Sequence, residues 1–256
     1  MKSVDLNCDL GESFGAYTDL LAVDTKVLPY ISSANIACGF HAGDPLVMQK
    51  TVRAALSSGV SLGAHPGLPD LAGFGRRNMS ISPEEAESYI IYQVGALQAF
   101  AFAEGASLRH VKPHGALYNM AAKDLKLAEG ICRGISRLCK NGNELVLVGL
   151  YGSHLIEAAK KVGIPYACEV FADRAYNDDG SLVSRSLPNA VIHNEEEAVS
   201  RSVRMVRDGI VTSVSGKEIP VQADTICVHG DNPSAIAFVQ KIRAALASEN
   251  IEISHL

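Results

Sequence analysis

The feature of this sequence that most constrains its fold is a repeat of short apolar runs separated by longer stretches with helical periodicity. Seven runs are candidate strands: 3–7, 31–37, 60–64, 109–112, 144–149, 166–171 and 225–228. Alternation of this kind is typical of βα units around a parallel sheet. The spacing favours a closed or nearly closed (β/α) barrel of about seven parallel strands. An open doubly wound sheet is the alternative.

Helix start signals lie between these runs. Ser82-Pro83-Glu84-Glu85 combines a capping serine, a proline at the first helical position and a glutamate three residues after the cap. Asn194 and Glu197 have the same spacing. Asp44-Pro45 and Asn232-Pro233 each pair a capping residue with proline, which predicts helices over residues 46–57 and 234–248. Asp44 is therefore interpreted as a cap rather than as a catalytic group.

Bulk properties narrow the class of protein. A chain of 256 residues with 47% hydrophobic and 20% charged residues can bury one sizeable core, so one catalytic domain over residues 1–256 is expected. The net charge of −5 and the lack of long basic runs argue against nucleic acid and anionic membranes as partners. Without a signal peptide or an apolar stretch of about 20 residues, a cytoplasmic location is expected. Six cysteines without a C-x-x-C pair indicate neither a zinc knuckle nor a disulfide framework.

Polar residues follow nearly every predicted strand. In parallel α/β folds the loops after the strands gather on one face, so these residues are expected to converge. Four of the eight histidines stand next to glycine or proline at such positions: His41, His65, His114 and His229. One histidine alone is more often a hydrogen-bonded structural residue, but four at equivalent places in the repeat indicate one shared site.

The first strand carries Asp5, Asn7 and Asp9 at a period of two, so the three side chains are expected to point the same way, into the mouth of the barrel. Strand-end carboxylates can simply satisfy loop amides. Three on one face are costly without partners, however, and we favour a functional role for Asp9. Glu12 and Asn35, which follow the first and second strands, are assigned with Asn7 and His229 to substrate binding.

Three cations are further candidates. Arg76 and Arg174 could each hold a carboxylate or phosphoryl oxygen with two parallel hydrogen bonds, although a solvated surface arginine is the alternative for Arg76. Lys112 ends an apolar run directly before Pro113-His114, which indicates a polarising or charge-stabilising role. The predicted catalytic set is therefore Asp9, His41, His65, Lys112 and His114.

Some motifs are missing from the sequence. Neither G-x-x-x-x-G-K-[ST] nor a G-x-G-x-x-G after a strand occurs, so the chain lacks the common nucleotide-binding loops. A G-x-S-x-G elbow is also missing, which disfavours a serine hydrolase of that type. Two long loops, 65–81 and 173–193, interrupt the regular alternation of predicted strands and helices. The second could form a small hairpin at Asp179-Gly180 that acts as a lid.

The motifs resemble those of the LamB/YcsF family, the group of 5-oxoprolinase A subunits. The segments that carry the resemblance are 5–13, 35–45, 63–67, 73–77, 111–119, 169–174 and 228–231, which together span essentially the whole chain in order. The resemblance implies a deacetylase-like (β/α) barrel and ATP-dependent hydrolysis of 5-oxoproline to L-glutamate, carried out with partner subunits B and C. It does not assign the catalytic roles.

The chemistry of the lactam favours a division of labour between this chain and its partner subunits. The five-membered lactam is a barely strained amide, and coupling to ATP would turn its carbonyl into a better electrophile. Because this chain lacks a nucleotide loop, we expect the partners to bind ATP and this chain to open the phosphorylated ring, with Asp9 or His41 as general base. Lys112, with His114, would stabilise charge and protonate the leaving nitrogen.

Two alternatives stay open. One is a metal-dependent amide or carbohydrate deacetylase, in which Asp9, His41 and His65 hold a divalent ion, although no tight H-x₃-H spacing supports it. The other is a non-catalytic subunit that binds substrate. Metal analysis and assays of the isolated chain distinguish these functions.

Overall fold

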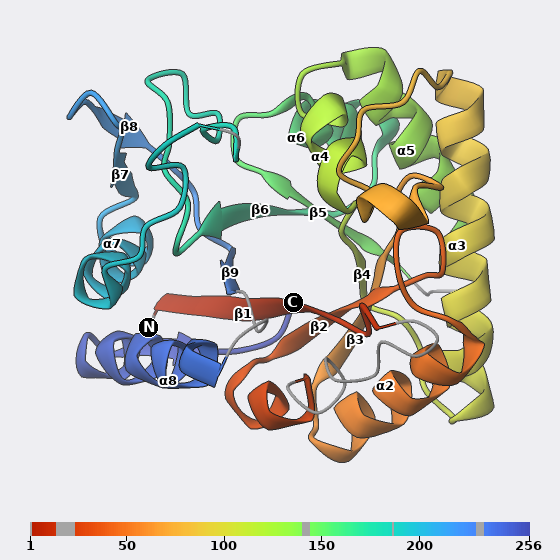
Figure 1. The fold of residues 1–256 in the computed structure, drawn as a ribbon, viewed down its shortest axis with the longest axis horizontal. Coiled ribbons are helices and arrows are strands. Elements are labelled where there is room, and N and C mark those ends of the chain that lie inside the picture. The colour runs from red at the N-terminus through yellow and green to blue at the C-terminus, as the bar shows by residue number, and fades with distance from the viewer. Residues whose placement is uncertain (1, 14–23, 140–143, 186, 229–232) are drawn as a thin grey trace.

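A computed structural model describes residues 2–13, 24–139, 144–185, 187–228 and 233–256. At its centre lies a closed barrel of seven parallel strands in the order β1-β2-β3-β4-β5-β6-β9, with β9 pairing back onto β1 (Figure 1). The strands are β1 (Lys2–Leu10), β2 (Ser33–Ala37), β3 (Ser61–His65), β4 (His110–Val111), β5 (Val146–Leu150), β6 (Tyr166–Phe171) and β9 (Thr225–Val228). All seven predicted strands are present, and the closed barrel is confirmed.

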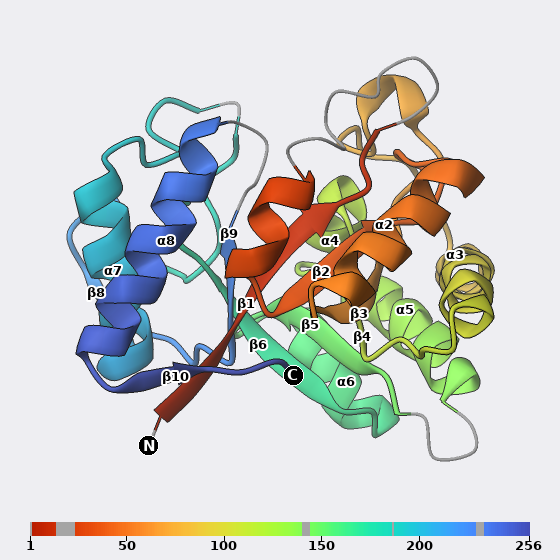
Figure 2. The same cartoon turned by 90° about the horizontal axis from the view of Figure 1, so that it is seen from below.

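Helices surround the barrel, as Figures 1 and 2 show. They are α2 (Pro45–Ser57), α3 (Pro83–Ala103), α4 (Gly115–Ala121), α5 (Leu125–Leu138), α6 (His154–Val162), α7 (Glu195–Arg207) and α8 (Pro233–Ser248), with short 3₁₀ turns η1 (Leu28–Tyr30) and η2 (Leu71–Gly73). Helix α3 packs on α5, α5 on α6, and α7 on α8. Among the described residues, no helix is both long enough and apolar enough to cross a membrane.

The predicted helix starts are confirmed where the structure describes them. The Asp44 side chain accepts hydrogen bonds from the amides of Leu46 and Val47. Ser82 and Glu85 form a reciprocal capping box, and Asn194 caps the amide of Glu197. Asn232 lies outside the described residues, but α8 begins at Pro233 as expected. These caps fix where each chain segment enters its helix after leaving the top of the barrel.

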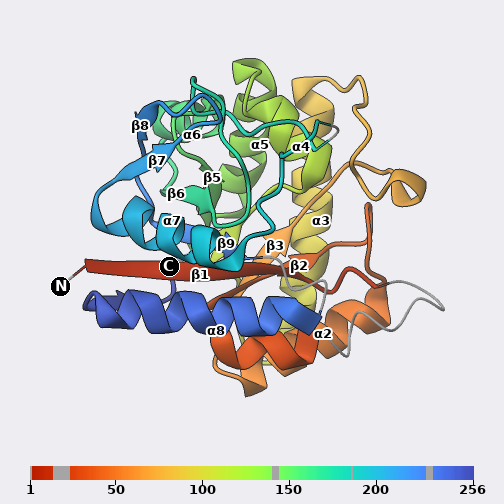
Figure 3. The same ribbon diagram turned by 60° about the vertical axis from the view of Figure 1, so that its left-hand side comes forward.

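Three short strands were not anticipated. Strand β10 (Ile251–Ile253) pairs in parallel with the start of β1 (Figure 2), and Figure 3 shows helix α8 running alongside β1. Strands β7 (Ile210–Thr212) and β8 (Glu218–Pro220) form an antiparallel hairpin outside the barrel. The predicted turn at Asp179-Gly180 is present, because Tyr176 and Leu182 bridge antiparallel across it.

Candidate active site

The inward face of β1 carries a column of polar residues, Asp5, Asn7 and Asp9, as the period of two predicts. Asp5 and Asn7 lie wholly inside the barrel, and only Asp9 reaches its mouth. Asp5 accepts hydrogen bonds from the hydroxyls of Ser32 and Thr225, and burial raises its pKa above the ordinary range. The lower part of the column therefore holds the strands together, and the upper part serves the cavity.

Lys112 extends from the end of β4 into this column. Its Nζ lies 3.0 Å from both Asn7 Oδ1 and Asp9 Oδ1. Glu169 Oε1 on β6 lies 2.8 Å from the same nitrogen. Burial disfavours the ammonium, since only 3% of the side chain is exposed, but Asp9 and Glu169 contribute to holding the pKa of Lys112 well above its usual value. The lysine is thus a buried cation shared by two carboxylates.

Glu169 is a site residue that is not among the catalytic or binding residues predicted from the sequence. Its side chain is 0% exposed, and it accepts hydrogen bonds from Asn7 Nδ2 at 3.1 Å and the Tyr118 hydroxyl at 2.8 Å. The sequence does contain a signal for this role: Glu169 lies within an otherwise apolar strand run, and a buried carboxylate needs a partner inside the fold.

Asn35 on β2 connects this network to β4. Its Nδ2 donates to Asn7 Oδ1 at 2.7 Å and to Asp9 Oδ1 at 2.8 Å, and His110 Nε2 donates to its Oδ1 at 2.7 Å. Burial lowers the pKa of His110 to about 3, so its ring is neutral. Asn7 and Asn35, predicted to bind substrate, are fully buried, where Asn35 donates to Asp9 and Asn7 accepts from Lys112.

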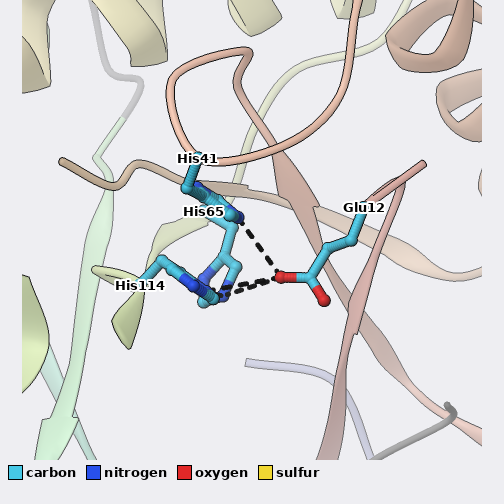
Figure 4. A group of neighbouring side chains, drawn as sticks. All are labelled: Glu12, His41, His65 and His114. Carbon is cyan, nitrogen blue, oxygen red and sulfur yellow. Dashed lines mark hydrogen bonds and ion pairs between the residues drawn. The ribbon is translucent and has the colours of Figure 1, made fainter. Parts of the chain in front are cut away.

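Three histidines and Glu12 form a second cluster, drawn in Figure 4. One ring nitrogen of each histidine and one oxygen of Glu12 all lie within 4.8 Å of one another. His41 and His114 stack with ring centroids 3.7 Å apart, and His65 stands at 87° to His114. His41, His65 and His114 therefore lie together, as predicted, and His65 Nε2 lies 3.3 Å from Asp9 Oδ2 on β1.

Backbone carbonyl groups fix two of these rings. His65 Nδ1 lies 2.7 Å from the carbonyl oxygen of Lys112, and His114 Nε2 lies 2.9 Å from that of Phe74. Since a carbonyl oxygen only accepts, each of these nitrogens carries a hydrogen. In a neutral ring, the lone pair would then lie on Nε2 of His65 and on Nδ1 of His114. Burial lowers the pKa of His114 well below its usual value, which favours the neutral ring.

A cavity of about 1350 Å³ opens above the two clusters. Its lining includes most of the predicted site residues: Asp9, Glu12, His65, Arg76, Lys112, His114 and Arg174. Asp9 and Glu12 have side chains that are 18% and 19% exposed, so a ligand can reach both carboxylates. His41, in contrast, is fully buried behind Glu12 Oε1, 3.2 Å from its Nε2. His229 lies outside the described residues.

The two predicted arginines differ in their freedom. Arg174 is buried, and its guanidinium donates to the carbonyl groups of Ala190 and Val183, so it holds the loop after β6 in place. Arg76 is exposed at the cavity wall, where its guanidinium lies 5.0 Å from the centre of the Phe74 ring. The neighbouring Arg77 is paired with Asp70. Of these cations, Arg76 is best placed to meet a ligand.

The fold and the site together define a (β/α)-barrel protein whose ionisable groups collect in one cavity at the carboxyl ends of its strands, the place where barrel enzymes carry their active sites. The sequence model of the LamB/YcsF family matches residues 4–256. The chain therefore belongs to the LamB/YcsF family, as its motifs predict.

Individual relatives cover the whole chain. A protein from Clostridium beijerinckii, named as the A subunit of 5-oxoprolinase, is 58% identical over 253 residues, which are 99% of this chain and 97% of that relative. One of the same name from Tolumonas auensis is 57% identical over 99% of both chains. The crystal structure of a lactam utilization protein from Thermus thermophilus matches with a TM-score of 0.92 and 45% identity over 100% of both chains.

Proposed function

We propose that this chain is the ring-opening component of an ATP-dependent 5-oxoprolinase that hydrolyses 5-oxoproline to L-glutamate together with partner subunits B and C. The observation that carries this proposal is the full-length similarity to relatives named as 5-oxoprolinase A subunits. The cavity supports it, because two accessible carboxylates and an arginine surround a space large enough for a small cyclic amide.

The chemistry needs activation because the lactam is a resonance-stabilised amide. In the proposed sequence, one of the partners transfers the γ-phosphoryl group of ATP to the carbonyl oxygen of the ring. Water then forms a bond to C5, the C5–N bond breaks, and the nitrogen takes up a proton. This leaves γ-glutamyl phosphate, which a second water hydrolyses to L-glutamate and phosphate.

Asp9 is the group of this chain best placed to accept the proton from water. Its Oδ1 is held by Lys112 and Asn35, while Oδ2 lies 3.3 Å from His65 Nε2 at the cavity wall. His41, the other predicted base, is fully buried and does not line the cavity, so it is not placed to contact the substrate. Lys112 is enclosed by its counter-charges, so we assign it the role of positioning Asp9 rather than of contacting the ring.

Arg76 is the proposed partner of the substrate α-carboxylate. A guanidinium offers two parallel hydrogen bonds to a carboxylate, and that of Arg76 lies at the rim of the same cavity. Arg174, also predicted to bind substrate, lines the cavity too, but its Nε and Nη2 donate to the backbone carbonyl groups of Ala190 and Val183. It therefore shapes the wall of the cavity.

Reconstitution tests the proposal. The purified chain alone should neither hydrolyse 5-oxoproline nor turn over ATP, and addition of subunits B and C should produce both activities in equal amounts. Replacing Asp9 by Asn in the complete complex should stop glutamate formation. ATP turnover by the isolated chain, or full activity of B and C without it, would contradict the division of labour.

A metal-dependent amide hydrolase is the second candidate function, because Glu12, His65 and His114 present three ligand atoms to one point. Hydrolysis of 5-oxoproline or another amide by the isolated, metal-loaded chain without ATP would favour it over the first.

A further inference from the structure

His65 and His114 face each other through the ring nitrogens that do not contact a backbone carbonyl group. Their facing nitrogens, Nε2 and Nδ1, lie 2.9 Å apart, and the hydrogens on both rings are engaged by backbone carbonyl groups on the opposite side. Two neutral rings in these tautomers would direct lone pairs at each other. A proton on one ring or a cation between the two removes this conflict.

Glu12 adds a third ligand atom at the same point. Its Oε1 lies 3.3 Å from His114 Nδ1 and 3.9 Å from His65 Nε2. Around a tetrahedral ion with bonds of about 2.1 Å, ligand atoms are separated by about 3.4 Å. The three separations, 2.9, 3.3 and 3.9 Å, bracket that value. The atoms are thus spaced as the ligands of one ion.

We propose that His65, His114 and Glu12 bind a divalent transition-metal ion such as Zn²⁺. The set of two histidines and one carboxylate is a common one for catalytic metal ions, and imidazole ligands favour zinc or iron over magnesium. The carbonyl groups behind both rings match the outer partners that metal-binding histidines use to fix their tautomers. Asp9, expected as a ligand in the metal alternative, has its Oδ2 3.3 Å from His65 Nε2, but it is not one of the residues whose ligand atoms all lie within 4.8 Å of one another, so we assign this role to Glu12.

The three metal-binding residues lie where small molecules can reach a bound ion. All three residues line the cavity, so one side of the ion would face the solvent-accessible space, as catalytic sites require. His41 Nε2 lies 3.2 Å from Glu12 Oε1, and its Nδ1 lacks a hydrogen-bond partner among the described residues. His41 therefore orients Glu12 or approaches the ion as a fourth ligand. A bound ion would supply a Lewis acid for a carbonyl or phosphoryl oxygen.

The glycines around the rings leave no room for them to move away. A Cβ atom at Gly67 would lie 2.6 Å from His41 Nδ1, and one at Gly75 would lie 2.6 Å from His41 Cβ and 2.9 Å from His114 Cδ2. The chain thus approaches the rings as closely as glycine allows. This close approach of the backbone restricts the His41 and His114 rings before an ion binds.

Metal binding is measured on the full chain after chelator treatment, by calorimetric titration with Zn²⁺ and by elemental analysis after dialysis. We expect one equivalent of Zn²⁺ per chain and an X-ray absorption spectrum with nitrogen and oxygen ligands and no sulfur. Glu12→Gln and His114→Gln should weaken binding by at least about tenfold, since even outer partners of metal ligands have effects of that size. Mg²⁺ should not compete.

His154→Gln is the matched control. His154 pairs with Glu157 at 2.7 Å at the edge of the cavity, so it reports binding to an exposed histidine and carboxylate. Its replacement should leave Zn²⁺ affinity unchanged. Failure of the wild-type chain to bind one equivalent would overturn the proposal, as would unchanged affinity in folded Glu12→Gln and His114→Gln chains. If either variant misfolds, the X-ray absorption spectrum of the wild-type chain tests the proposal: nitrogen and oxygen ligands support it, and sulfur ligands contradict it. The measurement needs neither substrate, ATP nor partner subunits, so it succeeds or fails independently of the proposed 5-oxoprolinase function.

Discussion

His65 and His114 meet nitrogen to nitrogen at 2.9 Å, although 49 positions separate them in the sequence. Each ring donates its opposite N–H to a backbone carbonyl group, so neither ring can rotate without breaking that hydrogen bond. The site is therefore fixed by the barrel itself. Groups held in this way lose little freedom when a ligand binds, which is the basis of preorganised catalysis.

Replacing Lys112 should lower the free energy of unfolding, because its ammonium group is buried between two carboxylates. Lys112→Met leaves Glu169, which is fully buried, and Asp9 without their shared cation. Removal of one partner of a buried ion pair costs about 3–5 kcal/mol. We expect that loss in the free energy of unfolding, measured by urea denaturation. Lys50→Met on the exposed face of α2 should change it by less than about 0.5 kcal/mol.

The double variant Lys112→Met/Glu169→Gln separates charge from packing. Neutralising Glu169 removes the uncompensated carboxylate, so the double variant should regain part of the stability that the single variant lost. If the Lys112→Met variant unfolds at the same midpoint urea concentration as the wild type, water or another cation replaces the ammonium. The proposal that Asp9 and Glu169 depend on Lys112 as their shared cation would then be wrong.

Gly63 on β3 should not tolerate a methyl group. A Cβ atom there would lie 2.0 Å from His110 Nε2, which donates to Asn35. Gly63→Ala must displace the ring and break that hydrogen bond, and we expect a loss of about 3 kcal/mol. Gly95→Ala is the control, because Gly95 lies in α3 with open space around it and should gain about 0.5–1 kcal/mol. Similar melting temperatures for the two variants would contradict the assigned packing.

Much of the fold could be predicted because its signals are local. Apolar runs located the seven strands, and Asp44, Ser82 and Asn194 marked helix starts through side-chain contacts only a few residues away. Convergence of the strand-end histidines followed from topology alone, since parallel strands place the loops that follow them on one face.

Depth along the barrel could not be predicted, because it depends on strand register. Asp5, Asn7 and Asp9 share one face, yet only Asp9 reaches the cavity. The parallel pairing of Asn7 with Ser33 and of Asp9 with Asn35 sets these heights, and nothing in the sequence specifies it. The role of Glu169 depends on the same register, since its partner Lys112 comes from a strand two places away in the barrel.

The buried, neutral His110 should make stability depend on pH. Burial lowers its pKa to about 3, whereas an unfolded histidine has a pKa near 6.5. Between these values the unfolded chain binds the additional proton, so stability falls as the pH decreases from about 6.5 toward 3, by up to about 1.4 kcal/mol per pH unit. Urea denaturation in the presence of chelator should show a shallower pH dependence for His110→Gln. An NMR titration of the wild-type ring between pH 5 and 8 would contradict this assignment.

Arg76 should control substrate affinity in the complete complex. Its guanidinium lies at the rim of the cavity, and a charge-assisted hydrogen bond to a carboxylate is worth about 1.5–3 kcal/mol. Arg76→Met should therefore raise KM for 5-oxoproline by roughly 10–100-fold with a much smaller change in kcat, the pattern of lost ground-state binding. Arg76→Lys keeps the charge but not the paired donors, so its KM should be intermediate. Arg77→Met is the control, since Arg77 is held by Asp70 rather than by a ligand. A fall in kcat at unchanged KM would instead place Arg76 at the reacting carbonyl or phosphoryl group, and the α-carboxylate would need another partner.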